Sequence, residues 1–241
     1  MFSQHCDQIR DASIAAYPNE AAFLILADGE CRQVNNCADD PTSTFRVSKR
    51  QMAAAHRRGL LAVVHSHPDY PQCPSEGDMR SQMAMGVPWG VIATDGVNAT
   101  EITWFGDQVE RQPLIGRGFV HGVTDCYSLI RDYYWLEQGI ELPDFPRSWE
   151  WWRNGQDLYR DGVEQAGFEQ IEAGDVRPGD MLWMQINSKV PSHGAIYMGG
   201  DLIMHHVTAR RPVDHTRTSH RTPIHRWQSY ITHYYRHREM T

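Results

Sequence analysis

No stretch of this sequence approaches the apolar length needed to cross a bilayer, and we expect no membrane insertion. Positive charge is not in excess: the formal net charge is −7 at pH 7, which argues against a general nucleic-acid-binding protein. No charged-then-apolar leader opens the chain, so we expect no signal peptide. The five cysteines form no CxxC pair and no framework spacing, which suits a chain made in a reducing cytosol.

The length of 241 residues allows one large domain or two of ordinary size. A stretch of charged residues, proline and glycine at 106–118 interrupts the pattern, and we predict a domain of residues 1–111 followed by one of residues 112–241. The first domain alternates expected strands with expected helices, which indicates a mixed sheet covered by helices. The expected strands are 21–27, 31–37, 45–47, 60–67, 87–94 and 102–105, and the expected helices are 3–17, 49–59 and 78–85.

Two histidines near the end of one expected strand stand one residue apart. His65 and His67 therefore point to the same side of the strand. Ser75 follows eight residues after His67, and Asp78 comes three residues later, where a helical pattern begins. Two imidazoles and one carboxylate are three ligands for a tetrahedral Zn2+, with the fourth position open to water. A histidine-rich turn is the competing interpretation, but the combined spacing favours the metal site.

This segment resembles the JAMM motif of the Mov34/MPN/PAD-1 metallopeptidases, in which HxH is followed after seven residues by SxxD. The resemblance implies a zinc-dependent peptidase with a mixed, cytidine-deaminase-like sheet. It also implies that Glu20, just before the first long strand, is the general base and that Ser75 helps to hold the oxyanion. Glu30 is the competing glutamate, but it lies in an Asp-Gly-Glu turn where we expect a solvated side chain.

A second candidate site begins at Cys126, the first residue of a helical pattern that Thr124 or Asp125 can cap. Free N–H groups in the first turn of a helix favour the reactive thiolate, although a lone cysteine is more often a core residue. Further along, His193 and His205 lie on two apolar runs separated by a Gly-Gly-Asp turn, which indicates a hairpin.

His193 is the candidate base for the thiol, and a residue on the second hairpin strand would orient its imidazole through the other ring nitrogen. The loop length decides which residue does so. A three-residue loop places His205 on the same face as His193, whereas a two-residue loop brings His206 there. We favour His205.

This second half resembles the NlpC/P60 cysteine peptidases, papain-like α+β enzymes that cut stem peptides of bacterial peptidoglycan. The resemblance implies Cys126 as the nucleophile, His193 as the base and His205 as the third polar group, with the γ-D-glutamyl to diamino acid link as the substrate bond. The family usually has a tyrosine ahead of the Asp-Cys pair whose hydroxyl helps to stabilise the oxyanion. The corresponding residue here is Phe119, and the loss of one such donor can cost on the order of a hundredfold in rate.

Aromatic residues gather between the candidate cysteine and the candidate histidine. Aromatic side chains stack on sugar rings in glycan-binding clefts, but they more often form a core or a subunit interface. Nothing in their spacing distinguishes these interpretations. The patch consists of Phe145, Trp149, Trp151, Trp152 and Tyr159.

A JAMM-like half followed by an NlpC/P60-like half is similar to the tail tip assembly proteins of lambda-like tailed phages. This resemblance implies a hydrolase with peptidase chemistry in both halves, which acts on peptidoglycan stem peptides and contacts other tail tip or baseplate proteins. It implies a location in the host cytoplasm during assembly and at the virion tail tip. Two alternatives remain, a structural assembly factor that uses both folds as binding modules and a bacterial cell-wall remodelling hydrolase.

Overall fold

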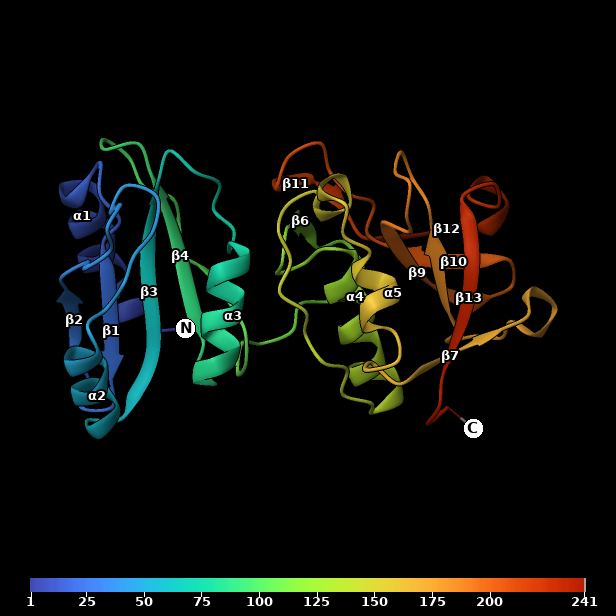
Figure 1. The fold of residues 1–241 in the computed structure, drawn as a ribbon, viewed down its shortest axis with the longest axis horizontal. Helices are drawn as coiled ribbons and strands as arrows, with labels where there is room; N and C mark the ends of the chain where they lie inside the picture. The colour runs from blue at the N-terminus through green and yellow to red at the C-terminus, as the bar shows by residue number, and fades with distance from the viewer. Residues whose placement is uncertain (241) are drawn as a thin grey trace. The chain divides into compact units, whose positions relative to one another are not determined.

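The computed structural model describes residues 1–240. The chain divides into two compact units, Met1–Glu110 and Arg111–Thr241. Each unit has its own sheet, and Figure 1 shows the helices and strands of both. In the described range, no helix combines the length and the apolar character that a membrane span requires.

The N-terminal unit is built on a five-stranded sheet with the order β2-β1-β3-β4-β5. The β3–β4 pair is parallel and the other pairs are antiparallel, so this is a mixed sheet. The strands are β1 (Ala22–Leu26), β2 (Cys31–Val34), β3 (Leu60–Pro68), β4 (Trp89–Thr94) and β5 (Thr103–Phe105). The helices are the 3-10 turn η1 (Ser3–His5), α1 (Cys6–Ala16), α2 (Lys49–Arg57) and α3 (Glu76–Met85).

The two faces of this sheet have different partners, because side chains alternate along each strand. Ile9 of α1 packs against Phe23 and Val64 on one face. His65, one position further along β3, points to the opposite face. Figure 1 shows α1 and α3 on opposite sides of the sheet. The face that carries His65 is therefore the one that α3 approaches.

The expected strand at 45–47 is wrong, because this segment is an irregular loop. The Asn36 side chain forms hydrogen bonds with the backbone of this loop. Its Nδ2 donates to the Thr44 carbonyl, and its Oδ1 accepts from the Arg46 N–H. A side chain that satisfies the backbone in this way competes with a strand ladder. The loop brings the Phe45 ring onto the His65 imidazole, with a centroid distance of 4.5 Å.

The C-terminal unit has a six-stranded sheet with the order β12-β10-β9-β8-β13-β7 and a separate β11–β6 pair. Its strands are β6 (Gly118–Val120), β7 (Phe168–Ile171), β8 (Met181–Met184), β9 (His193–Gly199), β10 (Leu202–His205), β11 (Val213–Thr218), β12 (His220–Pro223) and β13 (Ile231–His237). Its helical segments are α4 (Cys126–Tyr133), the π-helical turn η2 (Tyr134–Gln138), α5 (Leu158–Gly162), and the 3-10 turns η3 (Trp151–Asn154), η4 (Ala173–Asp175) and η5 (Ile224–Arg226).

Helices α4 and α5 lie on one side of the six-stranded sheet (Figure 1). Leu129, Ile130 and Tyr133 repeat at helical spacing along α4 and are buried against Trp183 of β8 and Ile196 of β9. This packing holds the N-terminus of α4, where Cys126 lies, next to the start of β9, where His193 lies. The core of this unit thus places Cys126 near the start of β9, although the residues of that strand that face α4 are Gly194 and Ile196, and not His193.

Candidate functional site

The two histidines of the first candidate site lie at the end of β3. In the β1–β3 pair Ala22 is opposite His65, and so an antiparallel continuation brings Glu20 opposite His67. The Ser66 hydroxyl between the histidines accepts a hydrogen bond from the Ala21 N–H at 2.8 Å, which ties the two strands together. Both imidazoles are buried, with exposed fractions of 0% for His65 and 8% for His67.

A reciprocal capping arrangement positions the third member of the site at the start of α3. The Ser75 hydroxyl accepts from the Asp78 N–H at 3.1 Å, and Asp78 Oδ2 accepts from the Ser75 N–H at 2.8 Å. Ser75 Oγ also donates to Asp78 Oδ2 at 2.7 Å. Such a cap satisfies free N–H groups of the first helical turn. Here it also orients the Asp78 carboxylate, and the Ser75 hydroxyl proton is engaged by that carboxylate.

The structure brings His65, His67 and Asp78 together. One ligand atom from each lies within 4.8 Å of the others. His65 Nε2 lies 3.3 Å from Asp78 Oδ1, and His67 Nε2 lies 3.6 Å from Asp78 Oδ2. The His67 Nδ1 atom is 3.0 Å from the Pro71 carbonyl, so Nδ1–H donates there and the Nε2 lone pair faces the other two residues.

These three residues fit a metal ion. Two imidazole nitrogens and one carboxylate are the donor set of an open zinc site. The Asp78 carboxylate is held in its charged form, because the two imidazoles outweigh the effect of burial and keep the pKa of Asp78 well below its usual range. A buried carboxylate with two imidazole nitrogens beside it is an arrangement that a divalent cation stabilises.

Glu20 and Glu30 have different surroundings. Glu20 is 5% exposed, and burial raises its pKa to about 7, with His67 acting in the opposite direction. Glu30 instead forms ion pairs with Arg32 and Arg58 at the surface. Of the two glutamates, Glu20 is the one within electrostatic reach of the histidine and aspartate cluster.

The second candidate site begins at the N-terminus of α4. Asp125 is the N-cap of this helix, and its carboxylate accepts from the Ser128 N–H at 3.0 Å. The Arg147 guanidinium donates two hydrogen bonds, of 2.9 and 3.0 Å, to the same carboxylate. Although burial opposes ionisation, Arg147 keeps the pKa of Asp125 well below its usual range. This buried pair fixes the residue that precedes Cys126.

The two hairpin histidines are joined by a hydrogen bond. The hairpin loop has two residues, Gly200 and Asp201, which by itself would bring His206 to the face of His193. A register shift between Leu202 and Ile203 places Ala195 opposite His205 instead, so His193 and His205 share a face. His193 Nε2 lies 3.0 Å from His205 Nδ1. The His206 Nε2 atom instead lies 3.0 Å from the Arg217 carbonyl. The geometry thus favours His205 over His206 as the partner of His193.

Burial keeps this histidine pair neutral. It lowers the pKa of His193 to about 3 and, together with the nearby His193, lowers the pKa of His205 to about 2. Within residues 1–240, His193 Nδ1 and His205 Nε2 are buried without a hydrogen-bond partner. A neutral His193 that donates from Nε2 to His205 leaves the lone pair on Nδ1 free to accept a proton.

Cys126 is half-buried and lies against the start of β9. Burial raises the pKa of the Cys126 thiol above the ordinary value, and the nearby Asp125 charge raises it further. Hydrogen bonds from the Tyr159 hydroxyl and the Gly194 N–H lower this pKa, but they do not outweigh burial. The Cys126 sulfur is 3.5 Å from the Tyr159 hydroxyl. In the described part of the chain, no hydrogen bond joins the sulfur to His193.

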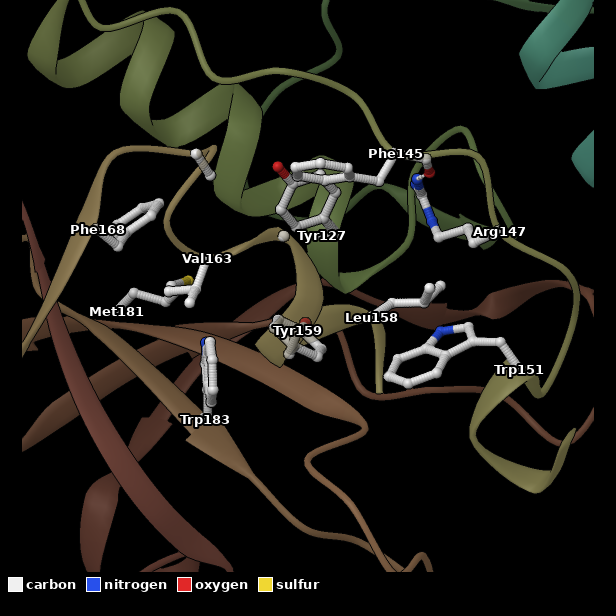
Figure 2. A pocket seen from close by; sticks show the side chains of 12 residues that line it. Tyr127, Phe145, Arg147, Trp151, Leu158, Tyr159, Val163, Phe168, Met181 and Trp183 are labelled. Atoms are coloured by element: carbon white, nitrogen blue, oxygen red, sulfur yellow. Dashed lines mark hydrogen bonds between the residues drawn. The ribbon is translucent and has the colours of Figure 1, made fainter. Parts of the chain in front are cut away.

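Aromatic side chains surround the thiol. Trp149, Trp151, Trp152 and Tyr159 line a hollow that also contains Cys126. Tyr159 in addition lines a neighbouring apolar cavity, where Figure 2 shows it near Trp183 and Leu158. The aromatic patch of the sequence is thus partly core and partly the wall of the thiol site.

Sequence reasoning missed two residues of this site. Arg147 gave no signal, because its partner Asp125 is 22 positions away and the intervening chain is irregular. The sequence indicates Tyr159 only as a member of the aromatic patch. The Phe119 ring, at the position where a hydroxyl was expected, packs against His206 and Trp149 with centroid distances of 5.2 and 6.1 Å.

Two family models match this chain. Residues 114–236 match the NlpC/P60 family. Residues 2–106 match the prokaryotic homologues of the JAB domain. A solved NLP/P60-family protein from Staphylococcus aureus covers 51% of this chain and 37% of its own length, with 20% identity and a TM-score of 0.33.

Two curated relatives cover larger parts of the chain. The tail tip assembly protein K of Escherichia phage lambda is 42% identical over 148 residues, which are 61% of this chain and 70% of the relative. The tail tip assembly protein K of Escherichia phage N15 is 30% identical over 207 residues, which are 83% of each. The chain therefore belongs to the tail tip assembly protein K family, with a JAB-like N-terminal unit and an NlpC/P60 C-terminal unit.

Proposed function

We propose that this protein is a phage tail tip protein whose C-terminal unit is a cysteine peptidase acting on peptidoglycan stem peptides. The observation that carries this proposal is the hydrogen bond between His193 Nε2 and His205 Nδ1. It leaves His193 Nδ1 without a partner in residues 1–240, at the start of the strand β9 that packs against α4, the helix of Cys126. The family membership supports the substrate class, and the γ-D-glutamyl to diamino acid bond is the link we expect the enzyme to cut.

The reaction follows from these groups. His193 Nδ1 takes the thiol proton, and the Cys126 sulfur forms a bond to the peptide carbonyl carbon while the carbonyl electron pair moves to oxygen. As that pair returns, the C–N bond breaks and His193 gives its proton to the leaving amine. Water then attacks the thioester, again losing a proton to His193, and the departing sulfur takes that proton back. His205 holds the His193 ring through Nε2 during both transfers.

The sulfur and His193 are not hydrogen-bonded in this structure. Proton transfer therefore needs a turn of the Cys126 side chain about its Cα–Cβ bond or a bridging water. Such hydrogen bonds commonly tighten only when substrate is bound. The arrangement is compatible with a resting enzyme whose thiol is protonated and whose base is neutral.

Incubation of the full chain with a defined muropeptide that contains the γ-D-glutamyl to diamino acid link tests this proposal. Mass spectrometry of the products identifies the bond cut. Cys126→Ala should reduce cleavage by at least about a thousandfold, because the bond-forming atom is lost. Cys37→Ala is the matched control, since Cys37 is an exposed free cysteine outside the site. Unchanged cleavage by Cys126→Ala, or none by the wild type, would overturn the peptidase assignment.

We further propose that the N-terminal unit is a zinc-dependent peptidase or isopeptidase in which His65, His67 and Asp78 hold the ion. When bound, Zn2+ would act as a Lewis acid on a carbonyl and lower the pKa of water. Glu20, which is buried and opposite His67, would take and return a proton at its carboxylate. The Ser75 N–H and the Ser75 hydroxyl both donate to Asp78 Oδ2 and would keep this ligand in position.

A non-catalytic assembly factor is the second candidate function. The observation that favours it is the Cys126 thiol itself, which has a raised pKa and no hydrogen bond to a base in residues 1–240. In that case both folds serve to bind other tail tip or baseplate proteins, during assembly in the host cytoplasm. Tail assembly that requires the protein but tolerates Cys126→Ala and His67→Ala would favour this candidate over the enzyme.

A further inference from the structure

The hydroxyl of Tyr159 is in contact with the sulfur of Cys126. The distance is 3.5 Å, which is within hydrogen-bonding range for sulfur, and the thiol is the one side-chain partner of this hydroxyl in the described range. Tyr159 is 9% exposed, and its ring packs against Trp183 and Trp151 with centroid distances of 5.4 and 6.1 Å. Figure 2 shows Tyr159 near Trp183 in this aromatic surround. The hydroxyl is therefore held in place by packing on the ring.

The direction of this hydrogen bond depends on the state of the sulfur. A neutral thiol and a phenol can each donate, but a thiolate can only accept. Burial raises the pKa of Tyr159 well above its ordinary value, so the phenol keeps its proton while the thiol ionises. The Tyr159 hydroxyl thus becomes the donor as soon as negative charge develops on sulfur.

The backbone beside the base is shaped around this hydroxyl. A Cβ atom on Gly194 would lie 2.6 Å from the Tyr159 oxygen and 2.6 Å from Ile130 Cδ1, which is far closer than real Cβ contacts. Gly194 directly follows His193 in β9. Because this position has no side chain, the hydroxyl can lie between α4 and β9, on the same side of the strand as the sulfur.

We propose that Tyr159 is a further catalytic residue of the thiol site, whose hydroxyl donates a hydrogen bond to the Cys126 sulfur in its anionic form. This inference rests on the proposed function, because it concerns the reacting sulfur of that peptidase. The donor comes from α5, downstream of the cysteine, and not from the Phe119 position of β6. The Phe119 ring has no hydroxyl and packs against His206 and Trp149, so it cannot supply this contact.

The charge that develops on a buried sulfur needs compensation. Burial disfavours the thiolate, and the adjacent carboxylate of Asp125 disfavours it further. The Tyr159 hydroxyl and the Gly194 N–H are the two donors that act in the opposite direction. A hydrogen bond to a charged group contributes roughly ten- to a hundredfold to such an equilibrium. Removal of the hydroxyl should therefore move the ionisation of Cys126 to higher pH.

Alkylation of Cys126 by iodoacetamide tests the inference without a peptide substrate. The thiolate sulfur displaces iodide, so the rate at each pH reports the ionised fraction. Mass spectrometry of the peptide that contains Cys126 separates this reaction from that of the other four cysteines. Tyr159→Phe should slow alkylation near pH 8 by about tenfold to a hundredfold and shift its pH profile to higher pH. Tyr134→Phe is the matched control, since its buried hydroxyl donates to the Gly179 carbonyl instead.

Each outcome of this experiment is decisive. A slower, alkaline-shifted reaction in Tyr159→Phe with an unchanged Tyr134→Phe supports the inference. An unchanged profile in Tyr159→Phe, or an equal shift in both variants, overturns it. If Tyr159→Phe does not fold, 3-fluorotyrosine at position 159 keeps the volume and makes the hydroxyl a stronger donor; a shift of the profile to lower pH supports the inference, and no shift overturns it. A failure of muropeptide cleavage leaves these alkylation profiles interpretable, so the two proposals fail separately.

Discussion

The two candidate sites are assembled in different ways. In the N-terminal unit the three candidate metal ligands lie within residues 65–78, and one strand end and one helix cap bring their ligand atoms within 4.8 Å of one another. In the C-terminal unit the candidate residues are spread from 126 to 205 and lie on different elements. There the structure shows two separate pairs, Cys126 with Tyr159 and His193 with His205.

This difference follows from the chemistry that each site can hold. In the first site the imidazole nitrogens and the carboxylate oxygens converge on one position, which is suited to a cation. The Cys126 thiol and the His193 imidazole are both neutral, and aromatic side chains line the hollow that contains Cys126. The first site turns its carboxylate and imidazoles toward one centre, whereas the buried charges beside the thiol, Asp125 and Arg147, pair with each other. Changes that disturb the second site should therefore appear first in thiol reactivity and stability, and changes that disturb the first should appear in metal affinity.

The largest stability effect is expected at Arg147. Arg147→Ala leaves the Asp125 carboxylate buried without its ion pair, which typically costs about 3–5 kcal/mol in the free energy of unfolding. Urea unfolding followed by tryptophan fluorescence measures this. The exposed Arg153 pairs with Glu150 across a largely solvated surface, so Arg153→Ala is the control and should change little. Equal losses in the two variants would contradict the view that the buried pair holds the thiol helix.

Acidification should weaken the C-terminal unit. The folded pKa of His193 is about 3 and that of His205 about 2, whereas an unfolded histidine has a pKa of about 6.5. The unfolded chain therefore binds more protons below pH 6.5, and stability is present above that pH and lost as the pH falls. From pH 6.5 to pH 5 we expect a loss of about 2 kcal/mol for each imidazole.

The pH dependence of urea unfolding checks this prediction. His193→Gln removes one of the two buried imidazoles and should reduce the slope of unfolding free energy against pH. His225→Gln, at an exposed position of the same unit, is the control. A slope that responds equally to both replacements would show that burial of the histidine pair is not its cause.

A smaller effect is expected at Ser75. Ser75→Ala removes the N-cap of α3 and should cost about 1 kcal/mol in unfolding free energy. It also removes the hydroxyl hydrogen bond to the Asp78 carboxylate and leaves only the one from the backbone N–H of residue 75, so zinc affinity should fall by roughly ten- to a hundredfold. Ser48 caps α2 in a similar way, with its hydroxyl accepting from the Gln51 N–H.

Ser48→Ala is therefore a matched control for the cap alone. It should lose comparable stability and keep its zinc affinity, as measured by competition with a chromophoric chelator. A fall in affinity in both variants would mean that the cap acts through the stability of the unit and not through the ligand. An unchanged affinity in Ser75→Ala would contradict the role assigned to its hydrogen bond with Asp78.

The sequence predicted the local parts of this molecule well. The strand that carries His65 and His67 and the helix predicted at 78–85, which begins two residues earlier at Glu76, follow from short-range periodicity. These two features depend on neighbouring residues and on strand alternation, which are visible in a single sequence. The face shared by His193 and His205 does not follow from turn length. The hairpin loop has two residues, and a register shift between Leu202 and Ile203 returns His205 to the face of His193.

The long-range parts could not be predicted in the same way. Arg147 reaches Asp125 from an irregular segment, and Tyr159 reaches Cys126 from a helix of five residues. Neither contact leaves a periodic signal, because tertiary packing alone creates it. The prediction of a strand at 45–47 is wrong for a related reason. The Asn36 side chain forms hydrogen bonds with the backbone of Thr44 and Arg46 in that segment.

We propose that the two units contain independent sites, one for a metal ion and one for a reactive thiol. Zinc content and muropeptide cleavage, measured together for wild type, His67→Ala and Cys126→Ala, test it most directly. We expect His67→Ala to lose zinc but keep cleavage, and Cys126→Ala to keep zinc but lose cleavage. Zinc content that does not respond to His67→Ala, or cleavage that survives Cys126→Ala, would contradict it.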